Sequence, residues 1–125
     1  MTNQMAETIQ GKLMTKHIVM WDMRGDTPAK KRETAAFVKR CFEDLAGKIP
    51  GMTKVEIGLD VSGVDYACDV VLYMEFESPE SLAAYASHPE HLRIKDVLGD
   101  CRIARHQVDY LVPVGNSALS ENTDR

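Results

Sequence analysis

The sequence predicts an α+β domain in which helices cover one face of a four-stranded antiparallel sheet. Four segments are predicted to be strands: 15–23, 53–61, 68–77 and 102–112. In the first three, residues at every second position fall on the same face, as they do in strands. Helix-like spacing of apolar residues separates the first segment from the second, and it recurs between the third and the fourth. Pro89 interrupts the second of these helical regions. The order β-α-β-β-α-β is that of the ferredoxin-like fold.

The first strand is apolar on both faces. Alternation places His17, Val19 and Trp21 on one face and Ile18 and Met20 on the other. We assign the face that carries the histidine to the helices. The opposite face then needs another cover, and a second copy of the chain is the simplest one.

The second and third strands are expected to supply much of the core, because both alternate regularly. Their inward-facing residues should be Val55, Ile57, Leu59 and Val61 in the second strand and Val70, Leu72, Met74 and Phe76 in the third.

Both helical regions begin with the same signal, a hydroxyl residue followed by proline. Thr27-Pro28 opens the first and Ser78-Pro79 opens the second. The hydroxyl oxygen can accept a free backbone N–H, and proline is tolerated at the first helical position. A short helix after Pro89 is expected to end at Gly99. We therefore predict two helical regions, the second of them broken.

The length of 125 residues fits one domain, which we place at 14–112. Residues 1–13 and 113–125 are polar, and we expect them to be a flexible N-terminal extension and a flexible tail. The formal net charge is −4 and the basic residues are scattered, which argues against nucleic acid as a partner. No apolar run is long enough to span a bilayer, and no secretory signal opens the chain. We therefore expect a cytoplasmic protein that does not bind a membrane.

The three cysteines, Cys41, Cys68 and Cys101, are dispersed and form no CxxC pair. Such spacing argues against a disulfide framework and against a zinc cluster. We expect three free thiols that are small, buried apolar side chains in a reducing cytoplasm.

The stretch YASHPEHLRIKD, residues 85–96, contains two of the four histidines, on either side of a proline. We interpret His88 as a structural cap at the helix break. His91 has two readings: a buried histidine that ties the short helix to Asp109, or a general base. A third possibility joins both histidines with Glu90 and His17 as zinc ligands. The proline disrupts the regular helix that usually sets such spacing, so we predict no metal site.

From about His17 to Val112 the chain resembles the stress-responsive A/B barrel (Dabb) family. The matching stretches are KHIVMW, KIPGMTKVEIGLD, EFESPESLAAYASHPEH and VDYLV. The run that ends in HPEH is the most specific of them. The resemblance implies a homodimer whose two sheets close into an α+β barrel, with a small cavity between sheet and helices in some members.

One member, the plant olivetolic acid cyclase, implies a chemistry and a set of residues. It is a cofactor-free catalyst of an aldol cyclisation, and the resemblance to it is distant. On its pattern His91 is the general base, Tyr85 holds the substrate carbonyl, Asp109 orients the histidine, and His17 is the histidine of the first strand. Tyr85 could equally be a core residue, and Asp109 could pair with Arg105.

Five apolar residues are expected to contact a substrate: Val19, Trp21, Phe42, Leu72 and Ile94. Positions that line an apolar pocket in the cyclase correspond here to Arg102, Arg105 and Gln107. A tyrosine and a histidine of the cyclase correspond to Cys41 and Val70. The cavity should therefore be more polar than that of the cyclase and take a different substrate.

Two functional hypotheses follow. The first is a catalyst of the cyclase, lyase or isomerase type that needs no cofactor and acts on a small carbonyl compound by acid–base chemistry. The second is a non-catalytic, stress-related or ligand-binding homodimer in which the same residues hold a corner of the fold together.

Overall fold

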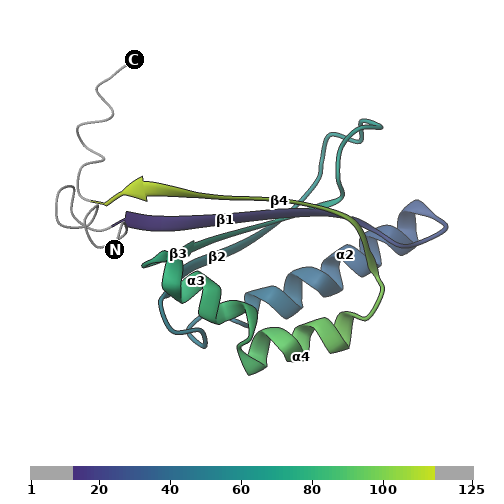
Figure 1. Cartoon of the computed structure of the whole chain (residues 1–125). Helices are drawn as coiled ribbons and strands as arrows, with labels where there is room; N and C mark the ends of the chain where they lie inside the picture. Colours follow the sequence, from purple (N-terminus) through teal and green to yellow (C-terminus); the bar gives the residue numbers. More distant parts are fainter. Residues whose placement is uncertain (1–12, 115–125) are drawn as a thin grey trace, which may run out of the picture.

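The computed structural model describes residues 13–114 and has the predicted ferredoxin-like architecture (Figure 1). The expected extension and tail lie outside the described residues, except that Leu13 pairs with Pro113 in the sheet. The elements are β1 (Leu13–Met23), α2 (Pro28–Glu43), β2 (Met52–Leu59), β3 (Val70–Phe76), α3 (Pro79–Ala86), α4 (Pro89–Leu98) and β4 (Arg102–Pro113).

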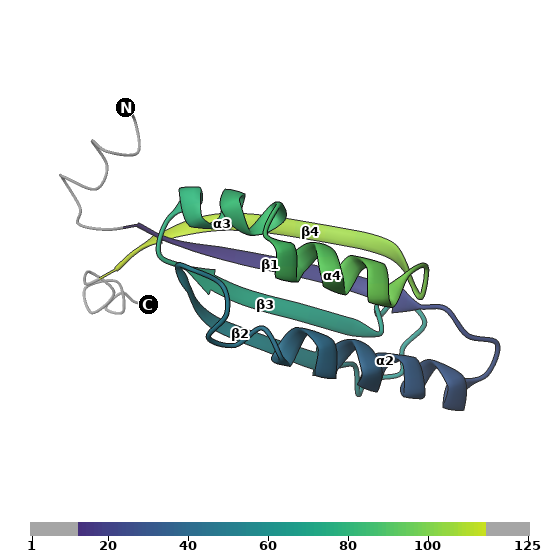
Figure 2. The same cartoon turned by 90° about the horizontal axis from the view of Figure 1, so that it is seen from below.

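The sheet has the strand order β2-β3-β1-β4, and all neighbours are antiparallel. All three helices lie on one face, with α2 beneath β2 and β3, and with α3 and α4 beneath β1 and β4 (Figure 2). The other face carries no helix (Figure 1). No helix among residues 13–114 is both long enough and apolar enough to cross a membrane.

The helix starts follow the predicted capping chemistry. The Thr27 hydroxyl oxygen accepts the backbone N–H of Lys30 at 3.1 Å. Ser78 and Ser81 form a reciprocal capping box at the start of α3. These caps fix where α2 and α3 begin, and therefore which of their side chains reach the sheet.

The core lies between the sheet and the helices. Trp21 of β1 stacks on Phe42 of α2, with ring centroids 5.6 Å apart. The buried apolar side chains of the strands are Val19, Trp21, Met23, Ile57, Val70, Leu72, Met74 and Phe76. The four residues expected to share one face of the third strand are therefore all buried.

The expected inward face of the second strand is wrong at its end. Val61 is 97% exposed, and Leu59 is also exposed. The strand stops at Leu59 because the Asp60 carboxylate accepts the backbone N–H of Gly63 at 2.9 Å, which turns the chain into the loop 60–69. The alternation of the sequence continues past the point where strand pairing ends.

A β-bulge interrupts the pairing of β1 with β4. Met20 pairs with His106 and Met23 pairs with Arg102, so three steps along β1 match four steps along β4. Within the longer stretch, Ala104 has a φ of 54°, in the left-handed region that L-residues avoid. The extra residue shifts the alternation of side chains between the two faces of β4. Arg102 and Arg105 therefore both lie on the helix side of the sheet.

We expect Ala104→Gly to stabilise the protein. The left-handed backbone costs an L-residue about 1–2 kcal/mol, and glycine loses about 0.5–1 kcal/mol more chain entropy on folding, so the net gain should be about 0.5–1 kcal/mol. Urea denaturation measures it. The matched control is Ala36→Gly inside α2, which should lose about 1 kcal/mol. Equal destabilisation by both substitutions would show that Ala104 is not strained.

Candidate active site

Two adjoining cavities lie between the sheet and the second helical region. We call them the small cavity, of about 60 Å³, and the large cavity, of about 240 Å³. Four side chains line both: His17, Tyr85, His91 and Arg105. The small cavity is completed by Val19, Trp21, Phe42, Leu72, Lys95 and Arg102. The large cavity is completed by Leu82, Ala83, Ala86, Gln107 and Asp109.

The sheet wall carries a chain of hydrogen bonds. His17 Nδ1–H donates to Asp109 Oδ1 at 2.6 Å, and Gln107 Nε2 donates to Asp109 Oδ2 at 3.1 Å. The Arg105 guanidinium in turn donates to the Gln107 carbonyl oxygen. The expected pairing of Asp109 with His91 is therefore wrong, because Asp109 lies directly opposite His17 in the β1–β4 register. The alternative partner of Asp109, Arg105, is joined to it only through Gln107.

His91 is oriented by the backbone. Its Nδ1 lies 3.0 Å from the carbonyl oxygen of Ala86, the last residue of α3. A carbonyl only accepts, so Nδ1 carries the hydrogen and Nε2 of the neutral ring is a free base. Burial lowers the pKa of His91, and the charges of Lys95, Arg102 and Arg105 lower it further, whereas the bond to Ala86 opposes them.

Tyr85 presents a hydroxyl group with no partner. Its side chain is buried, at 4% exposed, and no described residue forms a hydrogen bond with its oxygen. Its ring centroid lies 4.4 Å from that of His91 and 6.3 Å from that of His17. Burial raises the pKa of the Tyr85 phenol well above its ordinary range, so the group stays protonated. A buried, unpaired donor beside a free base is an arrangement suited to an oxygen atom of a ligand.

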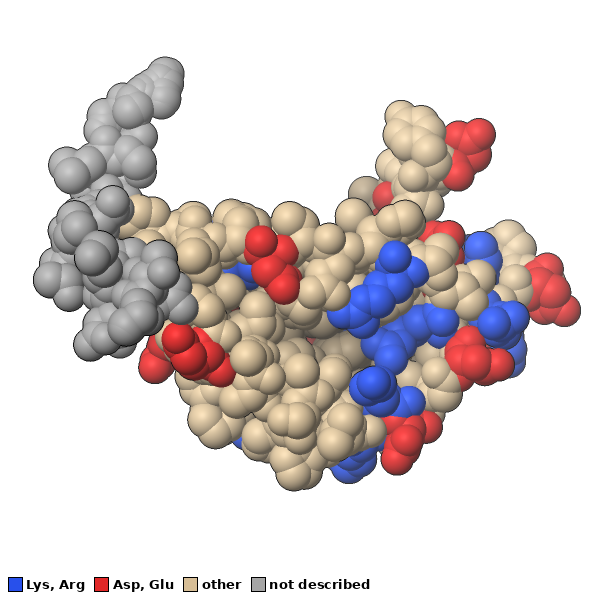
Figure 3. All heavy atoms as spheres, viewed as in Figure 1, with Lys and Arg blue, Asp and Glu red and all other residues tan. Residues whose placement is uncertain are grey.

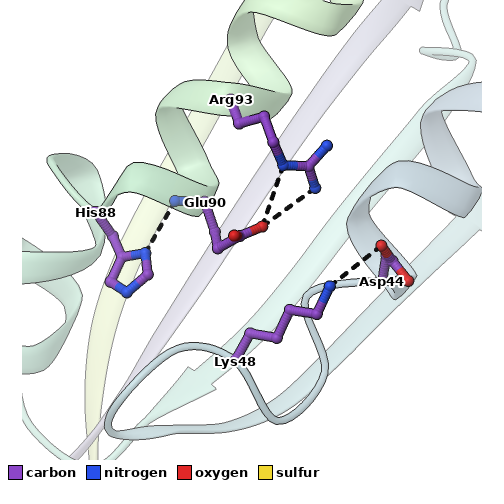
Figure 4. A network of polar contacts seen from close by, with 5 residues as sticks. All are labelled: Asp44, Lys48, His88, Glu90 and Arg93. Carbon is purple, nitrogen blue, oxygen red and sulfur yellow. Dashed lines mark hydrogen bonds and ion pairs between the residues drawn. The ribbon is translucent and has the colours of Figure 1, made fainter.

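His88 has the structural role that the sequence predicts. It is the N-cap of α4, and its Nδ1 accepts the backbone N–H of Glu90 at 3.0 Å (Figure 4). The Glu90 carboxylate pairs with Arg93 at 3.2 Å (Figure 4). These bonds engage two of the four proposed zinc ligands, and within residues 13–114 no three histidine, cysteine or acidic side chains gather as a metal site.

The small cavity is as polar as the sequence predicts. Lys and Arg side chains gather between α4 and the start of β4 (Figure 3), and those at the cavity are Lys95, Arg102 and Arg105. The Arg102 guanidinium carbon lies 4.7 Å from the Trp21 ring centroid and 5.7 Å from that of Phe42.

Four of the five expected substrate contacts, Val19, Trp21, Phe42 and Leu72, line the small cavity, whereas the buried Ile94 lines neither cavity. Sequence reasoning missed Lys95 and the carbonyl oxygen of Ala86. Lys95 could have been found, because it lies one helical turn after His91 on α4. The role of the Ala86 carbonyl could not have been predicted, because every residue has a backbone carbonyl and the sequence does not distinguish this one.

We expect the His91 ring to titrate below its ordinary pKa of 6.5, as proton NMR of the imidazole would measure. Below that pH the unfolded chain binds a proton that the folded chain does not yet bind. The free energy of unfolding should therefore fall as the pH drops from 6.5 to the pKa of folded His91. His91→Gln should remove that part of the pH dependence. A titration midpoint of His91 above 6.5 would contradict the assignment.

The chain matches the family model described as "Stress responsive A/B Barrel Domain" (Dabb) over residues 15–112. A dimeric ferredoxin-like protein of unknown function from Bacteroides fragilis is 33% identical, with 79% of this chain and 96% of that chain covered and a TM-score of 0.70. A dimeric ferredoxin-like protein of unknown function from Thermobifida fusca is 18% identical, with 81% and 92% covered and a TM-score of 0.68.

A hydroxynitrile lyase from Passiflora edulis is 12% identical, with 81% of this chain and 94% of that chain covered and a TM-score of 0.66. At such identities the Thermobifida and Passiflora structures show a common fold and no more. No match to a curated protein was found. The family match includes all three helices and the whole sheet apart from the outer ends of β1 and β4. The fold and the HPEH run agree with this match. The chain therefore belongs to the Dabb family.

Proposed function

We propose that this protein catalyses a proton transfer at carbon next to the carbonyl group of a small compound, without a cofactor, in a reaction of the lyase, cyclase or isomerase type. One observation carries the proposal. The buried Tyr85 hydroxyl has no partner among the described residues, and the Tyr85 ring packs against the ring of His91, whose tautomer leaves Nε2 free.

The chemistry divides between the two side chains. His91 Nε2 takes a proton from the carbon next to the carbonyl, and the electron pair of that C–H bond moves onto the carbonyl oxygen. The Tyr85 hydroxyl donates a hydrogen bond to the enolate oxygen that develops. The enolate carbon then either takes the proton back from the His91 imidazolium or attacks a carbonyl carbon, and in the second case the alkoxide that forms takes the proton from His91.

Burial prepares both groups for these roles. It lowers the pKa of His91, so the ring is neutral and basic at pH 7. It raises the pKa of Tyr85, so the phenol keeps the hydrogen that it must donate. The Ala86 carbonyl takes the orienting role that the family resemblance gives to Asp109, and Asp109 instead holds His17 as an auxiliary polar group at the wall of both cavities.

The competing proposal is a non-catalytic ligand-binding protein, and the same hydrogen bond supports it. The contact of His91 with Ala86 joins α4 to the end of α3 across the break at Pro89. In that case the bond is a structural tie, and removal of the His91 ring should cost stability. The two proposals differ most sharply at Tyr85, whose hydroxyl group forms no hydrogen bond with any residue of 13–114 that could stabilise the fold.

We also propose that two copies of the chain pair through the face of the sheet that carries no helix. An outer patch there consists of Ile18, Met20, Val71, Tyr73, Val108 and Tyr110. Ile18 lies opposite both Val108 and Tyr73, so the patch is continuous across three strands. The loop 60–69 projects from this same face (Figure 1), and a hollow of about 560 Å³ lies at its base. The Bacteroides relative, 33% identical, is dimeric.

We expect Val108→Asp to convert a dimer into monomers, because a charge would then lie within the buried patch. The matched control is Val97→Asp on α4, since Val97 is 49% exposed and Val108 is 51% exposed. Size-exclusion chromatography with light scattering should give the mass of one chain for Val108→Asp, and of two chains for the control and the parent. A monomeric parent at micromolar concentration would overturn the dimer.

We expect Tyr85→Phe to retain stability, because the lost hydroxyl made no hydrogen bond. It should slow catalysis about 10²–10³-fold through the loss of an oxyanion donor, and His91→Gln should slow it about 10²–10⁴-fold. Exchange of solvent deuterium into neutral and anionic small ketones, followed by NMR, measures the proton transfer without knowledge of the product.

Two substitutions at the hollow on the other side of the sheet, Tyr66→Phe and His106→Gln, serve as controls, and both should leave exchange unchanged. If His91→Gln destabilises the fold as strongly as the truncation of a core residue, and Tyr85→Phe alters neither stability nor exchange, the structural tie is the better account. Loss of exchange in both cavity variants, with thermal unfolding unchanged, supports the catalyst.

A further inference from the structure

Three cations at the small cavity have no acidic partner in the described part of the chain. Within residues 13–114, no carboxylate forms an ion pair with Lys95, Arg102 or Arg105. By contrast, Arg93 on the same helix as Lys95 pairs with Glu90 at 3.2 Å. The chain as a whole is acidic, with a formal net charge of −4. A cluster of unpaired cations in an acidic protein leaves positive charge available to a ligand.

Arg102 is held over aromatic rings and partly buried. Its guanidinium lies on the stacked pair of Trp21 and Phe42, which attracts the cation but supplies no hydrogen-bond acceptor. Burial lowers the pKa of this guanidinium. A partly buried charge without a counterion is unfavourable, and an anion in the cavity would relieve that cost.

A strained backbone conformation at Ala104 brings Arg102 and Arg105 to the same face of the sheet. Regular alternation would place residues three apart on opposite faces of β4. The bulge, with Ala104 in the left-handed region, puts Arg102 and Arg105 on the same side, where both line the small cavity. Strained residues in sheets are found near functional sites, where the geometry that they hold is needed.

The cavity volumes limit what can bind. A water-sized group needs about 10–15 Å³, so the small cavity, at about 60 Å³, admits a group of a few atoms. The large cavity holds more, and Leu82, Ala83 and Ala86 give it an apolar wall. Tyr85 and His91 line both cavities and therefore lie where they meet.

We propose that the substrate bears a carboxylate, which Arg102 and Lys95 bind in the small cavity while its carbonyl group lies against Tyr85 and His91. The apolar remainder of the substrate occupies the large cavity. This inference rests on the proposed function for the role of the carbonyl group, whereas the carboxylate subsite stands on the cations and the cavity. A carboxylate has three heavy atoms and fits the small cavity better than a phosphate ester does.

Substrate charge would then act on the base. The charged and titratable groups that share a cavity with His91 are Lys95 on its own helix, Arg102, Arg105 and Asp109 on β4, His17 on β1 and Tyr85 on α3. The three cations lower the pKa of His91 in the free protein. A bound carboxylate offsets their charge, so His91 becomes a stronger base when an anionic substrate is present.

The test uses 4-oxopentanoate, which carries a ketone and a carboxylate, and its methyl ester, which lacks the charge. Binding is followed by calorimetry and by the NMR titration of the His91 ring. We expect the acid to bind at least tenfold more tightly than the ester and to raise the pH midpoint of His91. Arg102→Gln should weaken binding of the acid at least tenfold, and Lys95→Gln several-fold. Arg32→Gln, an exposed arginine of α2, should change nothing.

Equal affinity for acid and ester, or binding that is indifferent to Arg102→Gln, overturns the carboxylate subsite. Inorganic phosphate that binds more tightly than the acid, with the same dependence on Arg102, also overturns it in favour of a phosphate site. If Arg102→Gln does not fold, Lys95→Gln and the comparison of acid with ester decide the question. If the carboxylate binds but no deuterium exchange occurs, the carboxylate subsite is supported and the proposed catalytic function is wrong. If neutral ketones exchange deuterium but the carboxylate does not bind, the catalytic function is supported and the carboxylate subsite is wrong.

Discussion

The antiparallel pairing of β1 with β4 is the constraint on which the sheet wall of the candidate site depends. Its register places Asp109 directly opposite His17, and the two side chains form a hydrogen bond of 2.6 Å. Farther along the same pairing, the bulge at Ala104 brings Arg102 to the helix side of the sheet. One strand pair therefore supplies the hydrogen-bond chain at the large cavity and two of the three cations at the small cavity, Arg102 and Arg105, whereas Lys95 comes from α4. A shift of β4 by one residue against β1 would move Asp109 and the β4 arginines to the opposite face of the sheet.

The break at Pro89 provides the other wall. His88 caps the new helix through Glu90, which consumes its Nδ1 lone pair. One turn later His91 reaches back to the Ala86 carbonyl, which fixes its tautomer. The two histidines of one short motif thus divide the tasks: the first terminates and restarts the helix, and the second is left with a free nitrogen at the cavity wall.

Burial acts on the two candidate catalytic groups in opposite directions and leaves both neutral at pH 7. The pKa of His91 falls and that of Tyr85 rises, because a low-polarity environment disfavours imidazolium and phenolate alike. Around this neutral pair the unpaired cations form a positive rim. Such a site favours reactions in which negative charge develops on oxygen, and it favours ligands that arrive with a negative charge.

The sequence by itself determined the element order, the helix starts at Thr27 and Ser78 and the cap at His88, because periodicity and capping are local properties of the chain. It also indicated which residues would gather, since His17, Tyr85 and His91 do line the same cavities. Only the tertiary structure decided how they pair. Partners of Asp109 and His91 depend on the register between distant strands and on a backbone carbonyl, and the inward turn of Arg102 depends on a bulge. Neither a strand register nor a bulge can be predicted from residue types along one segment, because each is set by packing across the sheet.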